Sequence, residues 1–168
     1  MNLISRFISS PLSRWLQHPR PTNDIPLSDF DRICHELKPG DVLLVEGRSR
    51  ISNVIKVVTQ SPWSHAALYI GRLHDIESEV DRATITRRSA FPPSTQLVVE
   101  SQLGTGTLAR ALTDYADDHL RICRPVGLST EDAQTISSHA ITSLGLDYDV
   151  RQIFDLARFL VPWGVLPR

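Results

Sequence analysis

A histidine and a glutamate in two separate apolar runs are the residues of this 168-residue chain best suited to acid–base chemistry. His65 opens the run 65–70, and Glu100 is the one charged side chain in the run 97–101. A carboxylate can hold one ring nitrogen of an imidazole while the other nitrogen acts as a base. If the two runs are neighbouring strands, His65 and Glu100 supply two of the three groups of a nucleophile triad.

Both runs have the length and the flanking turn signals of strands, in which successive side chains point to opposite faces. We expect the even-numbered residues of 65–70 to face the core and the odd-numbered ones to face the opposite surface. There the small side chain of Ala67 leaves room beside His65 for a substrate or a second catalytic group. Each residue also has a structural interpretation, since a strand histidine is often satisfied or on the surface and a strand glutamate often faces solvent.

A nucleophile is harder to find, because the chain has two cysteines. Cys34 falls on the inward face of a predicted helix over residues 28–37. Cys123 lies in a predicted strand, away from any helix N-terminus that would activate a thiol, although it shares a face with Arg121. It is therefore either a stand-in nucleophile or a small buried apolar residue. Two cysteines are too few for a disulfide framework, which favours a reducing, cytoplasmic compartment.

Apolar periodicity and turn signals predict the elements that must position these residues. In addition to the helix and the strands already named we expect, in chain order, a strand at 41–46, a helix at 51–58, a long polar loop or irregular hairpin at 72–96, a turn at 104–106, a strand at 120–124, a serine-capped helix at 129–144 and a helical pattern at 150–160. This order indicates an α+β domain with a mostly antiparallel sheet.

Three segments carry a resemblance to a known family: residues 37–44 (Leu-Lys-Pro-Gly-Asp-Val-Leu-Leu), residues 52–71 with Ser64-His65-Ala66 at their centre, and residues 97–100. They resemble the circularly permuted papain-like enzymes of the NlpC superfamily, nearest the YiiX/YaeF group. Residues 145–149 are similar to the Gly-x-x-Tyr-Asp step that precedes the nucleophile helix of that family. The similarity covers residues 37–160.

The resemblance implies a six-stranded open barrel flanked by helices, with the triad in the order histidine, polar residue, cysteine. His65 matches the base and Glu100 the orienting residue, and the residues expected to line the cleft are Asp41, Ser64, Ala67 and Tyr148. The family's cysteine opens a helix after the Tyr-Asp step, yet no cysteine lies between residues 149 and 168. The apolar run 159–167 independently suggests a domain that continues. We therefore expect residues 27–168 to be a papain-like domain cut short at its C-terminal end.

The resemblance implies a cysteine hydrolase or acyltransferase that acts on an amide or an ester. We expect the chain of 168 residues to be inactive, because it lacks the nucleophilic thiol. Peptides, peptidoglycan and lipid acyl groups are all candidate substrates. The alternative is a non-catalytic binding module that keeps the fold.

Eighteen basic and nineteen acidic residues give a net charge of -1, which argues against a nucleic-acid partner. No dinucleotide or phosphate-binding loop is present, and the acidic stretch 74–81 lacks metal-ligand spacing, so we expect no cofactor, no metal and a solvated loop there.

Residues 1–26 read as an amphipathic segment followed by a proline-rich linker. Arg6 and Arg14 interrupt any signal-peptide core, and no apolar run approaches the roughly 20 residues of a membrane span. The apolar stripe of residues 3–16 is typical of a helix that packs on its own domain or on a partner, and a basic helix with Trp and Phe can also lie in a membrane interface.

The membrane interpretation predicts that the chain floats with liposomes and that deletion of residues 1–20 abolishes flotation, because the apolar stripe is then lost. The measurement is the distribution of both forms in a density gradient. Equal distribution of the two forms excludes peripheral attachment through this segment.

Overall fold

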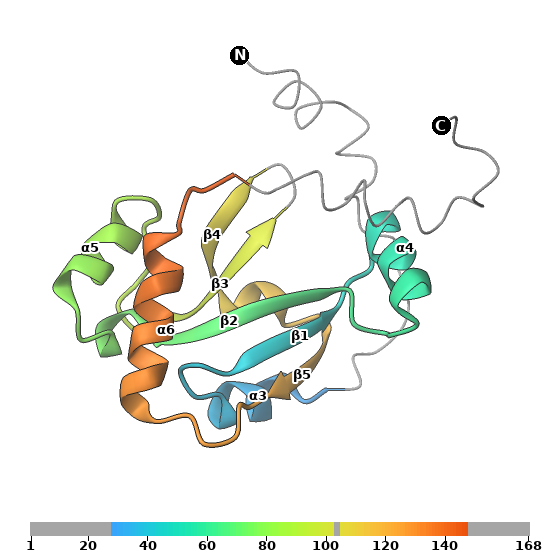
Figure 1. Cartoon of the computed structure of the whole chain (residues 1–168), viewed down its shortest axis with the longest axis horizontal. Helices are drawn as coiled ribbons and strands as arrows, with labels where there is room; N and C mark the ends of the chain where they lie inside the picture. The colour runs from blue at the N-terminus through green and yellow to red at the C-terminus, as the bar shows by residue number, and fades with distance from the viewer. Residues whose placement is uncertain (1–27, 103–104, 148–168) are drawn as a thin grey trace, which may run out of the picture.

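A computed structural model describes residues 28–102 and 105–147, which form an open antiparallel sheet with helices on both faces (Figure 1). The strand order is β4-β3-β2-β1-β5, and each neighbouring pair is antiparallel. The strands are β1 (Val42–Glu46), β2 (His65–Arg72), β3 (Gln96–Gln102), β4 (Gly106–Ala111) and β5 (His119–Cys123). The α-helices are α3 (Phe30–Glu36), α4 (Arg50–Thr59), α5 (Glu79–Thr86) and α6 (Thr130–Thr142), with 3-10 turns η1 (Leu73–Asp75) and η2 (Leu112–Tyr115).

The sheet separates two hydrophobic cores. On one face α3 and η2 pack against β1, β2, β3 and β5, with Leu43, Tyr69 and Val98 at the centre. On the other face α5 and α6 pack against β2, β3 and β4, around Leu97 and Ile141. Burial of apolar surface on both faces fixes the strand register, since a slip by one residue would exchange the two faces.

Most of the expected elements are present. The antiparallel α+β class is confirmed, as are the helices near 28–37, 51–58 and 129–144 and the four expected strands. The Ser129 hydroxyl and the Asp132 carboxylate form a reciprocal capping box at the start of α6. After α6, Gly145 has φ +87°, the left-handed conformation that only glycine adopts readily.

The expected assignment of the two faces of β2 was right for Leu68 and Ile70, which pack in a core, but wrong for the opposite face, which is covered as well. Ala67 and Tyr69, on the same face as His65, are buried in the core beneath α3 and η2, whereas Ala66 is exposed. Alternation separates the two faces of a strand, but it does not say which face is covered. Here both faces are covered along much of β2, and His65 lies at the end where its own face opens to solvent.

Two other expectations were wrong as well. The polar segment 72–96 is not a simple loop, because it contains η1 and α5, and Asp81, expected in a solvated stretch, is buried on α5. Its Ser78 cap, with Asp81 three residues later, is a helix-start signal that the high charge of the segment obscured. Strand β4 was missed because its initial glycine and its two alanines have weak strand propensity, and its pairing with β3 supplies the missing stabilisation.

The structure describes five strands instead of the six that the resemblance implied, and the sheet is not closed within the described residues. The expected helix within 1–26, the residue Tyr148 and the helical pattern at 150–160 lie outside the described residues. Within the described ranges, no helix is long and apolar enough to cross a bilayer.

Replacement of Ile85 by alanine tests the contribution of α5 to the core. Ile85 is fully buried between the sheet and α6, so Ile85→Ala should lower the free energy of unfolding by about 2–5 kcal/mol. Val80→Ala on the same helix is the matched control, because Val80 is 72% exposed and its loss should change the stability by less than about 0.5 kcal/mol. The measurement is urea unfolding of both variants; equal effects would contradict the packing of α5 against the sheet.

Candidate active site

The main chain around His65 is held in place by the end of β1. His65 is the first residue of β2 and pairs with Val45 of β1. Immediately before it, the Ser64 amide donates to the carbonyl of Val45 at 3.1 Å, and the Ser64 hydroxyl accepts from the Gly47 amide at 3.0 Å. Ser64, an expected cleft residue, therefore ties the start of β2 to the loop after β1.

The structure brings His65 and Glu100 into direct contact, with a short hydrogen bond between Nε2 of His65 and Oε2 of Glu100. Leu68 pairs with Val99, and continuing this register one step places Glu100 opposite Ala67. Because Ala67 is small, the imidazole of His65 can lean along the strand and reach the carboxylate diagonally. Thus Ala67 contributes by leaving space between His65 and Glu100 and is itself buried.

This contact determines which ring nitrogen of His65 can act as a base. A carboxylate without its proton only accepts hydrogen bonds, so Nε2 of His65 carries the hydrogen and donates it to Glu100. The Nδ1 nitrogen then has a free lone pair. The side chain of His65 is 31% exposed while that of Glu100 is 2% exposed, so the histidine is accessible and the carboxylate behind it is not.

Two further side chains hold the Glu100 carboxylate from its other sides. The hydroxyl of Tyr115, from η2, donates a short hydrogen bond to Oε2, the same oxygen that meets His65. Arg110, from β4, lies with Nη1 3.3 Å from Oε1. The guanidinium of Arg110 also lies over the Tyr115 ring, 5.3 Å from its centroid, and donates through Nε to Asp114 at 3.0 Å.

These contacts set the charges of the site. Burial by itself would raise the pKa of Glu100, but the hydrogen bonds from His65 and Tyr115, together with the charge of Arg110, bring that pKa below its usual value. Burial and the neighbouring negative charge of Glu100 raise the pKa of Tyr115 far above its usual value, so the phenol stays protonated. The site therefore holds an ionised carboxylate and a neutral donor at neutral pH.

Tyr115 and Arg110 were not among the site residues expected from the sequence. Arg110 pairs with Val98, which lies two residues along β3 from Glu100. Arg110 is therefore close to Glu100 only because β4, a strand not expected from the sequence, pairs with β3. The available signal was the alternation of side chains along the segment 106–111. Leu108 pairs with Glu100, so Arg110, two residues later, lies on the same face of the sheet as Glu100. Tyr115 lies on a short 3-10 turn that leaves no periodic pattern.

Asp41, in contrast, is separate from this site. It precedes Val42, which pairs with Leu68, whereas His65 pairs with Val45 at the other end of β1. The buried Asp41 carboxylate binds Arg124 through two hydrogen bonds of 2.8 Å and accepts from the Lys38 amide at 2.7 Å. It serves as the structural partner of Arg124, and Tyr148 lies outside the described residues.

Neither cysteine approaches His65. The carbonyl of Cys34 accepts from the Gln96 side chain, and Gln96 pairs with Arg72 at the opposite end of β2 from His65. Burial raises the pKa of the Cys34 thiol, which disfavours a thiolate. Cys123 pairs with Val42, three positions along β1 from the partner of His65 and on the opposite face of the sheet. The described residues thus hold a base and its supporting carboxylate without a thiol beside them.

Comparison with known families agrees with this geometry. A family model described as "Permuted papain-like amidase enzyme, YaeF/YiiX, C92 family" matches residues 36–157, a span that includes His65, Glu100, Arg110 and Tyr115. No curated protein matches the chain.

The low pKa of Glu100 predicts an acid-sensitive contribution to stability. Since the folded state binds this proton less tightly than the unfolded chain, the contribution is fully present above the usual pKa of about 4.3 and is lost as the pH falls below it. Tyr115→Phe removes one donor, so the pKa of Glu100 should rise and the stability at pH 7 should fall by about 1.5–3 kcal/mol. The measurements are the carboxyl NMR titration of Glu100 and urea unfolding.

Tyr69→Phe is the control, because Tyr69 is a buried tyrosine of the same core whose hydroxyl contacts Gln96. It should leave the titration of Glu100 unchanged. An identical titration in wild type and Tyr115→Phe would show that the phenol does not support the carboxylate.

Proposed function

Because the chain belongs to the YaeF/YiiX family of permuted papain-like amidases, we propose that it carries the base and the orienting residue of a cysteine amidase, His65 and Glu100. The observation that supports this proposal is the hydrogen bond from Nε2 of His65 to the buried, ionised Glu100, which leaves Nδ1 free. An imidazole oriented in this way is what thiol activation requires.

In the proposed reaction Nδ1 of His65 takes the proton of a thiol, and the thiolate attacks the carbonyl carbon of an amide. The imidazolium then returns its proton to the leaving amine as the carbon–nitrogen bond breaks, which leaves a thioester. Water, deprotonated by the same histidine, hydrolyses the thioester to a carboxylic acid and regenerates the thiol. Glu100 stays ionised throughout and stabilises the imidazolium.

The thiol has to come from outside the described residues. Leu146 lies beside the start of β4, where its carbonyl accepts from the Thr107 amide at 2.9 Å, and Gly106 pairs with Gln102. Residue 147, the last described residue, therefore lies near the end of the sheet where His65 lies. Since the sequence has no cysteine from 124 to 168, we propose that the thiol is encoded beyond Arg168. Extension of the genomic reading frame past residue 168 is the direct check.

The substrate class proposed is an amide, in a peptide or peptidoglycan stem or attached to an acyl chain. Esters and acyl transfer follow the same thioester chemistry, so they belong to the proposal as well. The apolar stripe of residues 3–16 favours a substrate near a membrane surface.

A second candidate function is a binding module that keeps the fold without catalysis. The observation that favours it is the position of both cysteines away from His65. This alternative predicts that any extended form of the protein lacks a thiol beside His65.

Labelling with a fluorescent chloroacetamide tests the amidase proposal. The extended protein, with Cys34→Ser and Cys123→Ser to remove background thiols, should be labelled at least tenfold faster than the same protein with His65→Ala, because the imidazole generates the thiolate. Mass spectrometry identifies the labelled residue.

The matched control is His74→Ala, since His74 is an exposed histidine that contacts Asp75 and the carbonyl of Pro93. It should leave the labelling rate unchanged. Equal rates in wild type and His65→Ala, or a reading frame that adds no cysteine, would support the binding module instead.

A further inference from the structure

Helix α4 has the reverse of the usual orientation of a surface helix, because a polar side is held against the sheet and its most exposed side is apolar. Lys56 donates to Glu46 of β1 at 3.2 Å, and Ser52, one turn before Lys56, packs against the loop after β1. Val54 lies on the side of the helix opposite Lys56, since successive residues are about 100° apart. Val54 is 42% exposed and Val57 is 72% exposed. A surface helix normally turns its apolar stripe toward the core.

The apolar residues of α4 form one continuous arc along the helix. None of them is buried, and of the four α-helices in residues 28–102 and 105–147, α4 is the one without a buried residue. A contiguous apolar surface that stays accessible is a signal of contact with a partner or a membrane. We call this arc the α4 surface; its members are Ile51, Val54, Ile55, Val57 and Val58.

The α4 surface lies at the end of the molecule where His65 opens to solvent. Figure 1 shows α4 beyond the start of β2, away from α5 and α6, and only a short loop separates α4 from His65. The chain also enters the described residues at this end. The Ser28 hydroxyl accepts from the Leu120 amide at 2.9 Å, and Asp118, two residues before Leu120, pairs with Arg48 at 3.5 Å.

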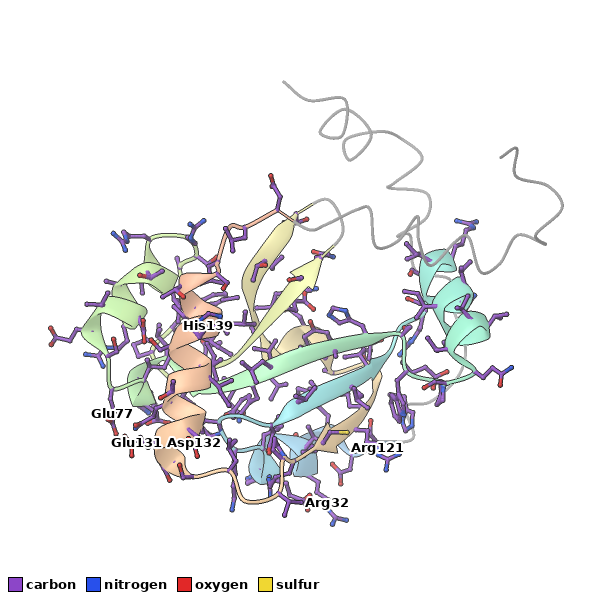
Figure 2. All side chains as sticks on the ribbon, viewed as in Figure 1. Arg32, Glu77, Arg121, Glu131, Asp132 and His139 are labelled. Carbon is purple, nitrogen blue, oxygen red and sulfur yellow. The ribbon has the colours of Figure 1, made fainter. Side chains whose placement is uncertain are left out.

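Positive charge is concentrated in the two segments that join the fold at this end. Residues 1–23 and 47–64 hold six basic and no acidic residues, whereas the rest of the chain holds twelve basic and nineteen acidic residues, a net charge of -7. Glu77, Glu131 and Asp132 belong to that acidic remainder and lie on the other side of the molecule from α4 (Figure 2). The net charge of -1 for the whole chain therefore conceals a strongly polarised molecule.

The described carboxylates nearest α4 reduce this positive charge without reversing it. Glu46 is paired with Lys56, and Asp118 is paired with Arg48. Asp117, next to Asp118, is the third carboxylate at this end. Three carboxylates compare with six basic residues in the two segments, so the net charge stays positive.

We propose that the α4 surface docks on an anionic lipid membrane, with its valines and isoleucines in the interfacial layer and the basic residues of the two segments near the lipid phosphates. Other occupants fit less well, because residues 1–23 and a second copy of α4 both have the same sign of charge as the α4 segment. The docking places His65 close to the membrane, but it does not depend on the activity proposed for His65, and its test measures no catalysis.

Flotation of the full chain with vesicles tests the docking. Wild type should float with vesicles of phosphatidylcholine that contain phosphatidylglycerol and should stay in the dense fraction with vesicles of phosphatidylcholine alone, because the apolar arc is short and needs the attraction between charges. Added salt should weaken flotation, since it screens that attraction.

Val57→Ser should lower the partition coefficient severalfold, and the double variant Val54→Ser, Val57→Ser should lower it about tenfold, because apolar surface no longer leaves water. Serine and valine have similar helix propensity, so α4 is retained and the urea midpoint should not change. The matched control is Val80→Ser, since Val80 is also 72% exposed but lies on α5, in the acidic part of the molecule. It should leave the partition coefficient unchanged.

The proposal is overturned if wild type does not float with the anionic vesicles. It is also overturned if the double variant binds as wild type does, which would assign the binding to residues 1–23 alone, or if Val80→Ser weakens binding equally. A lower urea midpoint or a folding failure in Val57→Ser would show that another part of the protein covers α4. A wild-type dimer that Val57→Ser dissociates would show a second copy there, and either result rejects the lipid assignment.

Discussion

The negative charge of Glu100 is the constraint around which this face of the sheet is organised. A carboxylate whose side chain is only 2% exposed is unfavourable unless other groups compensate it, and three side chains do so here: His65 from β2, Arg110 from β4 and Tyr115 from η2. The strand order brings them together, because β3 carries Glu100 between β2 and β4. Each partner reaches the carboxylate diagonally across the sheet or from the turn after β4.

This network serves packing and chemistry together. Tyr115 is buried in the core beneath α3 and η2 while its hydroxyl meets the carboxylate, so the core fixes the donor. Arg110 contacts both the Tyr115 ring and Glu100, which restricts both groups. The side chains of His65 and Arg110 are 31% and 30% exposed, whereas Glu100 and Tyr115 are buried. A buried carboxylate and its phenol donor behind an accessible imidazole form the arrangement that general-base chemistry needs.

The two faces of the sheet carry different polar features. On one face Glu100 is fully compensated by its neighbours, and on the other Asp81 and Ser137 lack partners within the described residues. Helices α5 and α6 bury these two groups while packing Ile85 and Ile141 against the sheet. The segment 72–96, which contains Asp81, is rich in charged residues of both signs, and for that reason neither its helix nor the burial of Asp81 was expected from the sequence.

Local patterns in the sequence predicted much of the fold. Apolar runs with turn signals identified β1, β2, β3 and β5, and the Ser129 cap identified α6, because these signals act within a few residues. Strand β4 and helix α5 escaped because their stability comes from contacts with distant elements, which no local propensity records. The same limit explains why the solvent-facing side of β2 was assigned wrongly, since coverage of a face depends on which helices return to it.

The sequence by itself determined that His65 and Glu100 are the residues suited to acid–base chemistry and that two strands carry them, but it left Cys123 open as a stand-in nucleophile, which the structure places away from His65. Only the tertiary structure decided that Nε2 of His65 meets Glu100, that Tyr115 and Arg110 complete the network, and that Asp41 belongs to a separate ion pair with Arg124. The physical reason is that residue type and alternation are properties of a short segment. Proximity across β2, β3 and β4 depends on strand order and register, which the burial of two cores on opposite faces of the sheet fixes.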